Sequence, residues 1–440
     1  MRRGRKVAVW LLGVAVLVAV AAVVGLHFSG VLRDAPPPDD ADLRMVRLDI
    51  PPEENAFTYL EALQVRLYGP QEGEGGSPHG IVHGKAWDAA AAADLLKRNE
   101  EALSHFDRAL ECRRLQMPAA TEGPDRGRAL SGCQEVALLN RLRARWLLRE
   151  GRHREALERA MAGVRFAQMI EQSAGGIPQW QLGASVKRVA LETLQEMLAE
   201  AELPPELWRR HAAALAECGA SRQGLADALR AEYVLAARTV DQVAGGDHGL
   251  DARLGWSGER ARRSSYHFQP NRTKRALAAT FRAIIANAPL SFAQRDFSGV
   301  ASGSDPVLVG RRIRALDNPA SWIIPNRPNM LGRALIAVLT PDYARIHEEK
   351  CVENVRVGAT RALLALKAYK LEHGELPDSL DALVPDYVNA VPSDDFDGEP
   401  LRYSREKRVV YSVGRDLVDD GGVEPTDAWT REEMVFPIEF

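Results

Sequence analysis

The feature that most constrains this fold is a change of apolar spacing near residue 371. Between Val352 and Tyr369, apolar side chains recur at alternating intervals of three and four residues, which places them on one stripe of a long helix within 332–371. Beyond it, Leu401–Tyr403 and Val409–Val413 are short β-prone runs separated by a polar turn. Because the stripe needs an apolar surface to pack against, the sequence predicts a β-hairpin lying on a long helix.

Most of the remaining chain has the spacing and composition of α-helices. Apolar residues recur at helical intervals among many Ala, Leu, Arg and Glu residues, which are strong helix formers. Residues 135–170 predict two helices broken at Gly151, with small residues that permit close contact, and resemble one tetratricopeptide hairpin without a second copy. Further helices are expected at 184–200, 205–218, 223–243 and from Asn271, as the cap, to Asn287. The predicted fold class is mainly α, with a small α+β domain at the C-terminus.

The N-terminal segment predicts a transmembrane helix. Val7–Phe28 contains 22 residues without a formally charged side chain, enough for a helix to cross about 30 Å of hydrocarbon. Basic residues precede the segment and aspartates follow it, so we expect a single-pass inner (plasma) membrane protein with a cytoplasmic N-terminus and an extracytoplasmic bulk. A cleaved signal peptide is the alternative, since Ala19-Val20-Ala21 offers a cleavage site, but the apolar run is longer than such peptides usually have.

Breaks in the apolar periodicity predict four regions. They are the basic tip and transmembrane anchor at 1–33, a Pro- and Asp-rich linker at 34–44, an α-helical body at 45–330 and a C-terminal domain at 331–440. The linker contains APPPDDAD, which favours an extended, solvated spacer between the membrane and the body. Gly-rich or Pro-rich stretches at 69–85, 245–270 and 289–329 are expected to be loops.

The charge balance argues against a nucleic-acid partner. The chain has 57 Lys and Arg residues against 60 Asp and Glu residues, and no basic patch interrupts this balance. Residues 371–440 alone carry 18 acidic and 6 basic residues, a local net charge of −12. The predicted partners are the lipid bilayer, through residues 7–28, and an envelope protein of unknown identity.

Three motifs near the C-terminus resemble the globular domain of the type II secretion major pseudopilin. They are ALKAYKLEHGELP at 365–377, SDDFDGEPL at 393–401 and YSVGRDLVDDGG at 411–422, in the order of the family's own motifs. The resemblance covers about 100 residues, from roughly 335 onward, and implies a long helix, a small antiparallel sheet and a structural calcium ion. The family's processing signal does not precede this helix, so we do not expect the chain to polymerise as a pilin.

The resemblance also implies calcium ligands in the last motif. Asp416 carries over from the family's calcium loop, and neighbouring carboxylates suit a hard cation. The candidate ligands are Asp416, Asp419, Asp420 and Asp427. Asp394, Asp395 and Asp397 form a second candidate cluster. The alternative is that these acidic residues are ordinary turn formers exposed to solvent.

No catalytic motif is recognisable in the chain. It has no GxSxG, Walker or GxGxxG pattern, and His347–Cys351 fails the HExxH pattern because its fifth residue is Cys, which favours the solvated first turns of a helix. His79 and His83 lie in a Gly-rich loop, where surface positions are expected. A hydrolase site, if there is one, is expected in the loops around Asp247, His248, His267 and Asp296.

The four cysteines contain no CxxC pair, which argues against a zinc or thioredoxin-type motif. Cys112 with Cys133 is the favoured pair if a disulfide exists, and free buried thiols are the alternative. From all these observations we predict a membrane-anchored extracytoplasmic binding or scaffold protein without enzymatic activity, stabilised by calcium. An exported hydrolase is the alternative.

Overall fold

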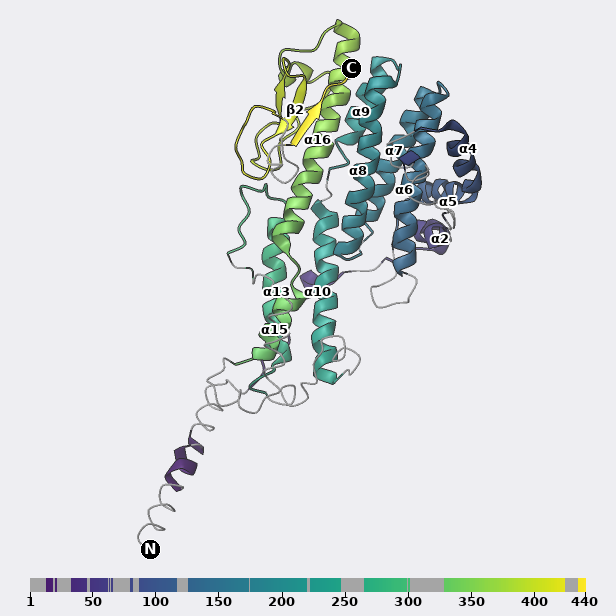
Figure 1. Cartoon of the computed structure of the whole chain (residues 1–440). Coiled ribbons are helices and arrows are strands. Elements are labelled where there is room, and N and C mark those ends of the chain that lie inside the picture. The colour runs from purple at the N-terminus through teal and green to yellow at the C-terminus, as the bar shows by residue number, and fades with distance from the viewer. Residues whose placement is uncertain are drawn as a thin grey trace, which may run out of the picture. The chain divides into compact units, whose positions relative to one another are not determined.

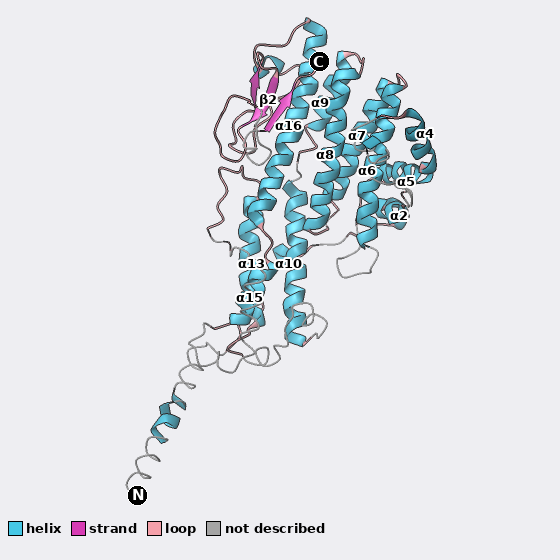
Figure 2. Ribbon diagram, in the orientation of Figure 1, coloured by secondary structure: helices cyan, strands magenta, loops and turns pink. Residues whose placement is uncertain are grey.

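The computed structural model describes residues 13–18, 20–21, 33–45, 48–61, 63, 65, 80–81, 87–116, 126–173, 175–219, 222–246, 265–298, 300, 328–423 and 434–440. These residues are mainly helical, with one small sheet near the C-terminus (Figures 1 and 2). The chain divides into two compact units, the first made of 1–44, 233–284 and 298–343 and the second of 45–232, 285–297 and 344–440. The predicted boundary at residue 330 follows the linear sequence, whereas each unit is assembled from three separate stretches.

The second unit is built mainly from packed helices. Its helices are α2 (Ala56–Glu61), α4 (Ala89–Arg98), α5 (Glu100–Glu111), α6 (Arg126–Arg149), α7 (His153–Glu171), α8 (Ile177–Glu200), α9 (Pro205–Leu215) and, from Ala344 onward, α16 (Tyr343–His373). Two short 3-10 helices, η2 (Pro52–Glu54) and η4 (Leu380–Leu383), belong to the same unit. The helices predicted between 135 and 218 are confirmed.

Small residues set the spacing of the helical hairpin formed by α7 and α8. Gly151, whose φ is +74°, separates α6 from α7 as predicted. At Gly163 of α7, an added Cβ would lie 3.1 Å from the Cβ of Ala190 on α8. The added Cβ would also lie 3.1 Å from Nδ2 of Asn140 on α6, so Gly163 permits the close contact that was predicted between the two helices of 135–170.

Two apolar cores hold the second unit together. One joins α2, α4 and α5 to α6, α7 and α8, and it includes the ring pair Phe106 and Phe166, whose centroids are 5.0 Å apart. The other joins α7, α8 and α9 to α16 and the C-terminal sheet. The predicted apolar stripe of α16 lies in this second core, where Val355, Ala362 and Leu366 are fully buried.

The C-terminal sheet has three antiparallel strands in the order β1-β2-β3. They are β1 (Arg402–Ser404), β2 (Val409–Ser412) and β3 (Met434–Pro437). The predicted hairpin of β1 and β2 is confirmed, with Tyr403 opposite Val410, whereas β3 was not predicted. Val410 and Phe436 are buried in the same core as α16, so the sheet packs on the helix as the apolar pattern requires.

The first unit contains α15 (Met330–Leu339), the Tyr233–Gly245 part of α10 (Arg222–Gly245) and most of α13 (Pro270–Asn287). The predicted helix over 332–371 is interrupted between α15 and α16, at Thr340 to Asp342, where Pro341 cannot continue a helix. The 3-10 helix η1 (Ala41–Leu43) lies within the predicted linker.

The residues of the predicted linker, most of which are exposed, bond to other parts of the first unit. Asp34 accepts hydrogen bonds from the backbone N–H groups of Asn271 and Arg272 at 2.8 and 3.0 Å, so it caps α13 in place of Asn271. Asp40 accepts a bond of 2.8 Å from the Tyr233 hydroxyl. Asp42 lies 2.6 Å from the guanidinium of Arg282.

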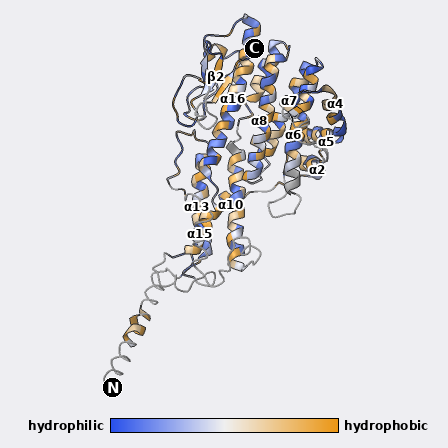
Figure 3. Ribbon diagram, in the orientation of Figure 1, coloured by the Kyte–Doolittle hydropathy of each residue, from blue (hydrophilic) through white to orange (hydrophobic). Residues whose placement is uncertain are grey.

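The predicted membrane anchor is contradicted within the part of the chain that the structure describes. No helix there is both long and apolar enough to cross a membrane. A span needs about 20 consecutive apolar residues, whereas the long helices alternate apolar and polar residues (Figure 3). The structure therefore contradicts three predictions: the single-pass topology, the inner-membrane localisation and the transmembrane element of the fold class. Residues 7–12, 19 and 22–28 of the predicted span lie outside the described residues.

Candidate functional site

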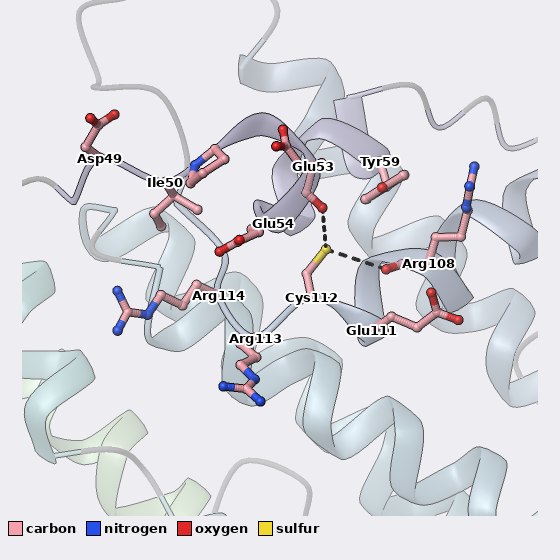
Figure 4. A pocket seen from close by; sticks show the side chains of 11 residues that line it. Asp49, Ile50, Glu53, Glu54, Tyr59, Arg108, Glu111, Cys112, Arg113 and Arg114 are labelled. Atoms are coloured by element: carbon pink, nitrogen blue, oxygen red, sulfur yellow. Dashed lines mark hydrogen bonds between the residues drawn. The ribbon is translucent and has the colours of Figure 1, made fainter.

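A pocket lies between the segment Asp49–Glu54 and the C-terminal end of α5 (Figure 4). Its volume is about 560 Å³, which is within the usual range for ligand sites. Its lining residues are Asp49, Ile50, Pro51, Glu53, Glu54, Tyr59, Arg108, Glu111, Cys112, Arg113 and Arg114. All of them belong to the second unit.

Two amide side chains hold the walls of this pocket together. The side chain of Gln116 bonds both backbone groups of Leu48, accepting from its N–H at 2.9 Å and donating to its carbonyl at 2.9 Å. The side chain of Asn55 does the same for the backbone of Gln116, at 2.9 and 3.0 Å. The backbone N–H of Ala56 donates to the carbonyl of Arg114 at 3.0 Å. These bonds join two segments about sixty residues apart and shape the pocket between them.

Charges of both signs surround the pocket. The lining includes three arginines, Arg108, Arg113 and Arg114, and four carboxylates, those of Asp49, Glu53, Glu54 and Glu111. All seven side chains are exposed. Within the described part of the chain, none of them forms an ion pair within 4.0 Å. The Arg108 guanidinium lies 5.5 Å from the centroid of the Tyr59 ring, a cation–π distance.

Cys112 lies at the centre of the lining, between Glu53 and Arg108 (Figure 4). Its thiol donates to the carbonyl of Glu53 at 3.8 Å and to that of Arg108 at 3.6 Å. Burial, followed by the negative charges of Glu111 and Glu54, raises the pKa of this thiol. Because the thiolate is the nucleophile, a raised pKa makes Cys112 less nucleophilic than an ordinary thiol.

All four cysteines are free thiols, and the Cys112–Cys133 disulfide is not formed. Cys133, Cys218 and Cys351 are buried, whereas Cys112 is half-buried. Cys112 is therefore the most accessible thiol of the chain. Because it lines the pocket, its reactivity with a thiol reagent can be used to follow changes there.

Two of the predicted calcium ligands, Asp416 and Asp419, accept hydrogen bonds from nearby backbone N–H groups in the loop after β2. Asp416 accepts from the backbone N–H of Val418 at 3.1 Å and Asp419 from that of Gly421 at 2.9 Å. Lys407 donates to the carbonyl of Gly421 at 2.6 Å. Among the residues that the structure describes, no three His, Cys, Asp or Glu side chains come close enough to hold a metal ion.

The loop conformation thus matches the turn-former alternative at Asp416 and Asp419. Asp420 is exposed on the same loop, and Asp427 lies outside the described residues. No group of three potential ligands lies together among the described residues of this loop. Calcium binding by Asp416, Asp419, Asp420 and Asp427 therefore stays a prediction.

The second acidic cluster is the centre of a hydrogen-bond network rather than an open metal site. Asp394 is fully buried and accepts bonds on both oxygens. The donors to Oδ1 are the N–H of Phe396 at 3.0 Å and the hydroxyl of Ser412 at 2.8 Å. The donors to Oδ2 are the N–H of Val413 at 2.9 Å and Nη1 of Arg402 at 3.0 Å. Arg402 also pairs with Asp397, and Lys350 lies 2.8 Å from Asp395, so protein cations contact all three carboxylates.

The segment His347–Cys351 is buried at three positions, and the prediction of a solvated helix turn is wrong. His347 Nε2 lies 3.2 and 3.1 Å from the carbonyls of Asn287 and Leu290, and the Cys351 sulfur is 3.7 Å from His347 Nδ1. Lys350 lies 2.8 Å from Asp395. Burial, followed by the charge of Lys350, lowers the pKa of His347 to about 4. The neutral imidazole is therefore a packing element in this position.

The residues proposed for a hydrolase do not form a described site. His267 belongs to the first unit and Asp296 to the second. Asp247, His248, His79 and His83 lie outside the described residues. A comparison of this chain with protein-family models, with curated proteins and with solved structures finds no match.

Sequence reasoning missed the pocket because its residues carry no motif. The charged residues of 49–54 and 108–114 resemble ordinary solvated surface in the sequence. The one available signal is the pair of amides Asn55 and Gln116, which lie in segments without strong helical periodicity. Their role can be recognised only once the fold places the two segments side by side.

Proposed function

We propose that this chain is a binding or scaffold protein that holds a polypeptide segment with charges of both signs in the pocket beside α5. The observation that carries this proposal is that three arginines and four carboxylates line a pocket of about 560 Å³. A ligand with charges of only one sign would meet like charges here. A nucleic acid is disfavoured for the same reason, because its phosphates would approach four carboxylates.

The weakness of each contact argues for an extended ligand. An exposed ion pair contributes about 1 kcal/mol or less, so useful affinity requires several pairs formed together. A polypeptide with alternating charges can supply them, and Tyr59, Ile50 and Pro51 offer apolar contacts for its side chains. The Asn55 and Gln116 bonds hold the pocket walls in place before the ligand arrives, which reduces the entropy lost on binding.

We further propose that the C-terminal domain is pseudopilin-like and serves as a structural module of this scaffold. The three motifs and the order of its elements, a long α16 followed by a small antiparallel sheet, support this proposal. A crystal structure of the whole chain, superposed on a secretion pseudopilin, tests it. A different strand order or a different helix–sheet contact would refute it.

The pocket is tested with the full chain and short fluorescein-labelled peptides. The probes are an alternating Lys-Glu peptide, an all-Lys peptide, an all-Glu peptide and a Gly-Ser peptide, each titrated by fluorescence anisotropy at low salt. We expect the alternating peptide to bind best and to slow the reaction of Cys112 with a thiol reagent. Salt should weaken this binding, because exposed charges are screened.

Charge reversal in the pocket supplies the control. The variant Arg113→Glu with Arg114→Glu should lose the preference for the alternating peptide. Arg188→Glu changes the same charge type at an exposed position of α8 outside the pocket and should bind like the unaltered protein. Equal binding of the alternating peptide to all three proteins, or no preference for it in the unaltered chain, would refute the proposal.

A further inference from the structure

A charged cluster is buried where α7, α8 and α16 meet. Lys187 of α8 lies between two glutamates, with its Nζ 2.7 Å from Glu171 Oε2 on α7 and 2.6 Å from Glu353 Oε1 on α16. The side chains of Lys187 and Glu171 are 0% exposed and that of Glu353 is 5% exposed. Gly183 makes room for Glu171, because an added Cβ would lie 2.5 Å from its Cγ.

The charges of this cluster do not balance when all three groups are ionised. One ammonium faces two carboxylates, which leaves a buried net charge of −1. In addition, Glu171 Oε1 and Glu353 Oε2 have no hydrogen-bond partner among the described protein atoms. Burying an uncompensated charge and unsatisfied oxygens costs several kcal/mol. A single proton on one carboxyl removes the net charge and supplies a new donor.

Among the residues that the structure describes, the groups around the cluster do not supply the missing positive charge. Glu349, one turn before Glu353 on α16, is itself acidic and accepts a bond from Gln181 of α8 at 2.7 Å. Cys218, after α9, donates to Gln168 of α7 at 3.5 Å. Arg165 of α7 acts on Cys218 electrostatically and is an exposed side chain. The compensating charge must therefore come from solution.

We propose that the Lys187–Glu171–Glu353 cluster binds one proton at neutral pH and acts as a pH-sensitive latch that holds α16 against α7 and α8. When the proton is present, the cluster is neutral and the helices pack around it. When the proton leaves to solvent, two carboxylates share one ammonium in a dry site, and α16 is released more readily. Because α16 and the C-terminal sheet share one core, the release extends to the C-terminal domain.

The directions of the pKa shifts in this cluster agree with the binding of one proton. Burial, followed by the charge of Glu353, raises the pKa of Glu171 well above its usual value, while the two glutamates outweigh the burial of Lys187 and raise the pKa of that ammonium. A raised carboxyl pKa in the folded state means that its stabilisation is complete below the unfolded pKa. That stabilisation is lost as the pH rises through the folded pKa.

The test is hydrogen exchange of the α16 amides in the full chain between about pH 7 and pH 9, where an ordinary histidine no longer titrates. Loss of one proton changes the opening equilibrium by up to about tenfold per pH unit. We expect protection in α16 to fall with pH in the unaltered chain and in the matched control Glu349→Gln. In Glu353→Gln, which cannot ionise, protection should not fall. Equal pH dependence in Glu353→Gln and the unaltered chain would overturn the proposal, as would its absence in all three.

A second measurement does not depend on the folding of a variant. Carbon-13-labelled glutamate in the unaltered chain should show one carboxyl resonance that titrates at a distinctly higher pH than the other glutamates. Absence of such a resonance overturns the proposal. Glu171→Gln and Glu353→Gln should each remove it, whereas Glu349→Gln should leave it in place.

Discussion

The helical bundle and the C-terminal domain each bury a carboxylate completely, but they surround it with different numbers of donors. Asp394 receives four hydrogen bonds, two on each oxygen, from the backbone, a hydroxyl and a guanidinium. Glu171 and Glu353 share one ammonium and keep unsatisfied oxygens. Burial raises the carboxyl pKa at both Asp394 and Glu171, and at Asp394 the hydrogen bonds oppose this effect.

The difference shows that burial alone does not decide what an acidic residue does. A carboxylate whose lone pairs are all satisfied can remain charged and organise the surrounding loops. A carboxylate that lacks donors gains by taking up a proton, and it then responds to pH. We therefore expect the two clusters to differ in how they respond to substitution and to pH.

The largest effect is expected from removal of the cation of the bundle cluster. Lys187→Met leaves two carboxylates facing each other in a buried site, so we expect a loss of about 3–5 kcal/mol in the free energy of unfolding. Denaturant unfolding at neutral pH measures it. The double variant Lys187→Met with Glu353→Gln should recover part of the loss, because only one ionisable group remains. A loss below about 1 kcal/mol in Lys187→Met would contradict the assigned charges.

The next largest effect is expected at low pH from His347. This buried histidine also makes stability depend on pH, so its contribution must be separated from that of the Lys187–Glu171–Glu353 cluster. Its pKa near 4 lies below the ordinary value, so the folded state binds fewer protons and stability falls as the pH drops below about 6.5. The shift corresponds to about 3 kcal/mol by pH 4. His347→Gln should flatten this acid limb in unfolding experiments, whereas Gln172→Ala, which removes an exposed neutral side chain, should not. An unchanged acid limb would mean that His347 is charged in the fold.

An effect of similar size is expected from loss of the satisfied carboxylate. Asp394→Ala leaves the N–H groups of Phe396 and Val413 without their acceptor, so we expect a loss of about 3 kcal/mol. Asp397→Asn is the control, because this side chain is 19% exposed and its pairing with Arg402 contributes about 1 kcal/mol or less. Thermal unfolding measures the loss of stability in both variants. Equal losses would mean that the buried carboxylate of Asp394 matters no more than the partly exposed one of Asp397.

The smallest effect on stability is expected at the pocket, where neutral amide side chains, and not charged groups, hold the walls together. Gln116→Ala removes two hydrogen bonds to Leu48, so we expect a loss of about 1–2 kcal/mol in unfolding free energy. The same variant should react faster at Cys112 with a thiol reagent, because the wall beside it is no longer held. Gln172→Ala, an exposed amide at the end of α7, is the control. No change in Cys112 reactivity would mean that Gln116 does not shape the pocket.

The helices were predictable because their signals are local. The 3.6-residue spacing of apolar side chains, the break at Gly151 and the prolines near helix starts act over a few residues, and the helices from α6 to α10 follow them. The strand β3 was missed because it lies more than twenty residues after β2, behind residues without a strand-like pattern. The membrane span was predicted from composition alone, and no described helix has the length and apolarity that it requires.

By itself, the sequence determined the local elements of this protein: the long helices, the hairpin packed on α16 and the acidic character of the last seventy residues. The tertiary structure decided which charges are buried and which face a pocket. Lys187 resembles a surface lysine within its own helix, and only glutamates from α7 and α16 make it the centre of a buried cluster. Likewise, Leu48 and Gln116 lie 68 residues apart and meet only in the folded chain. Electrostatic energies depend on distance and burial in space, and neither quantity is encoded in local sequence spacing.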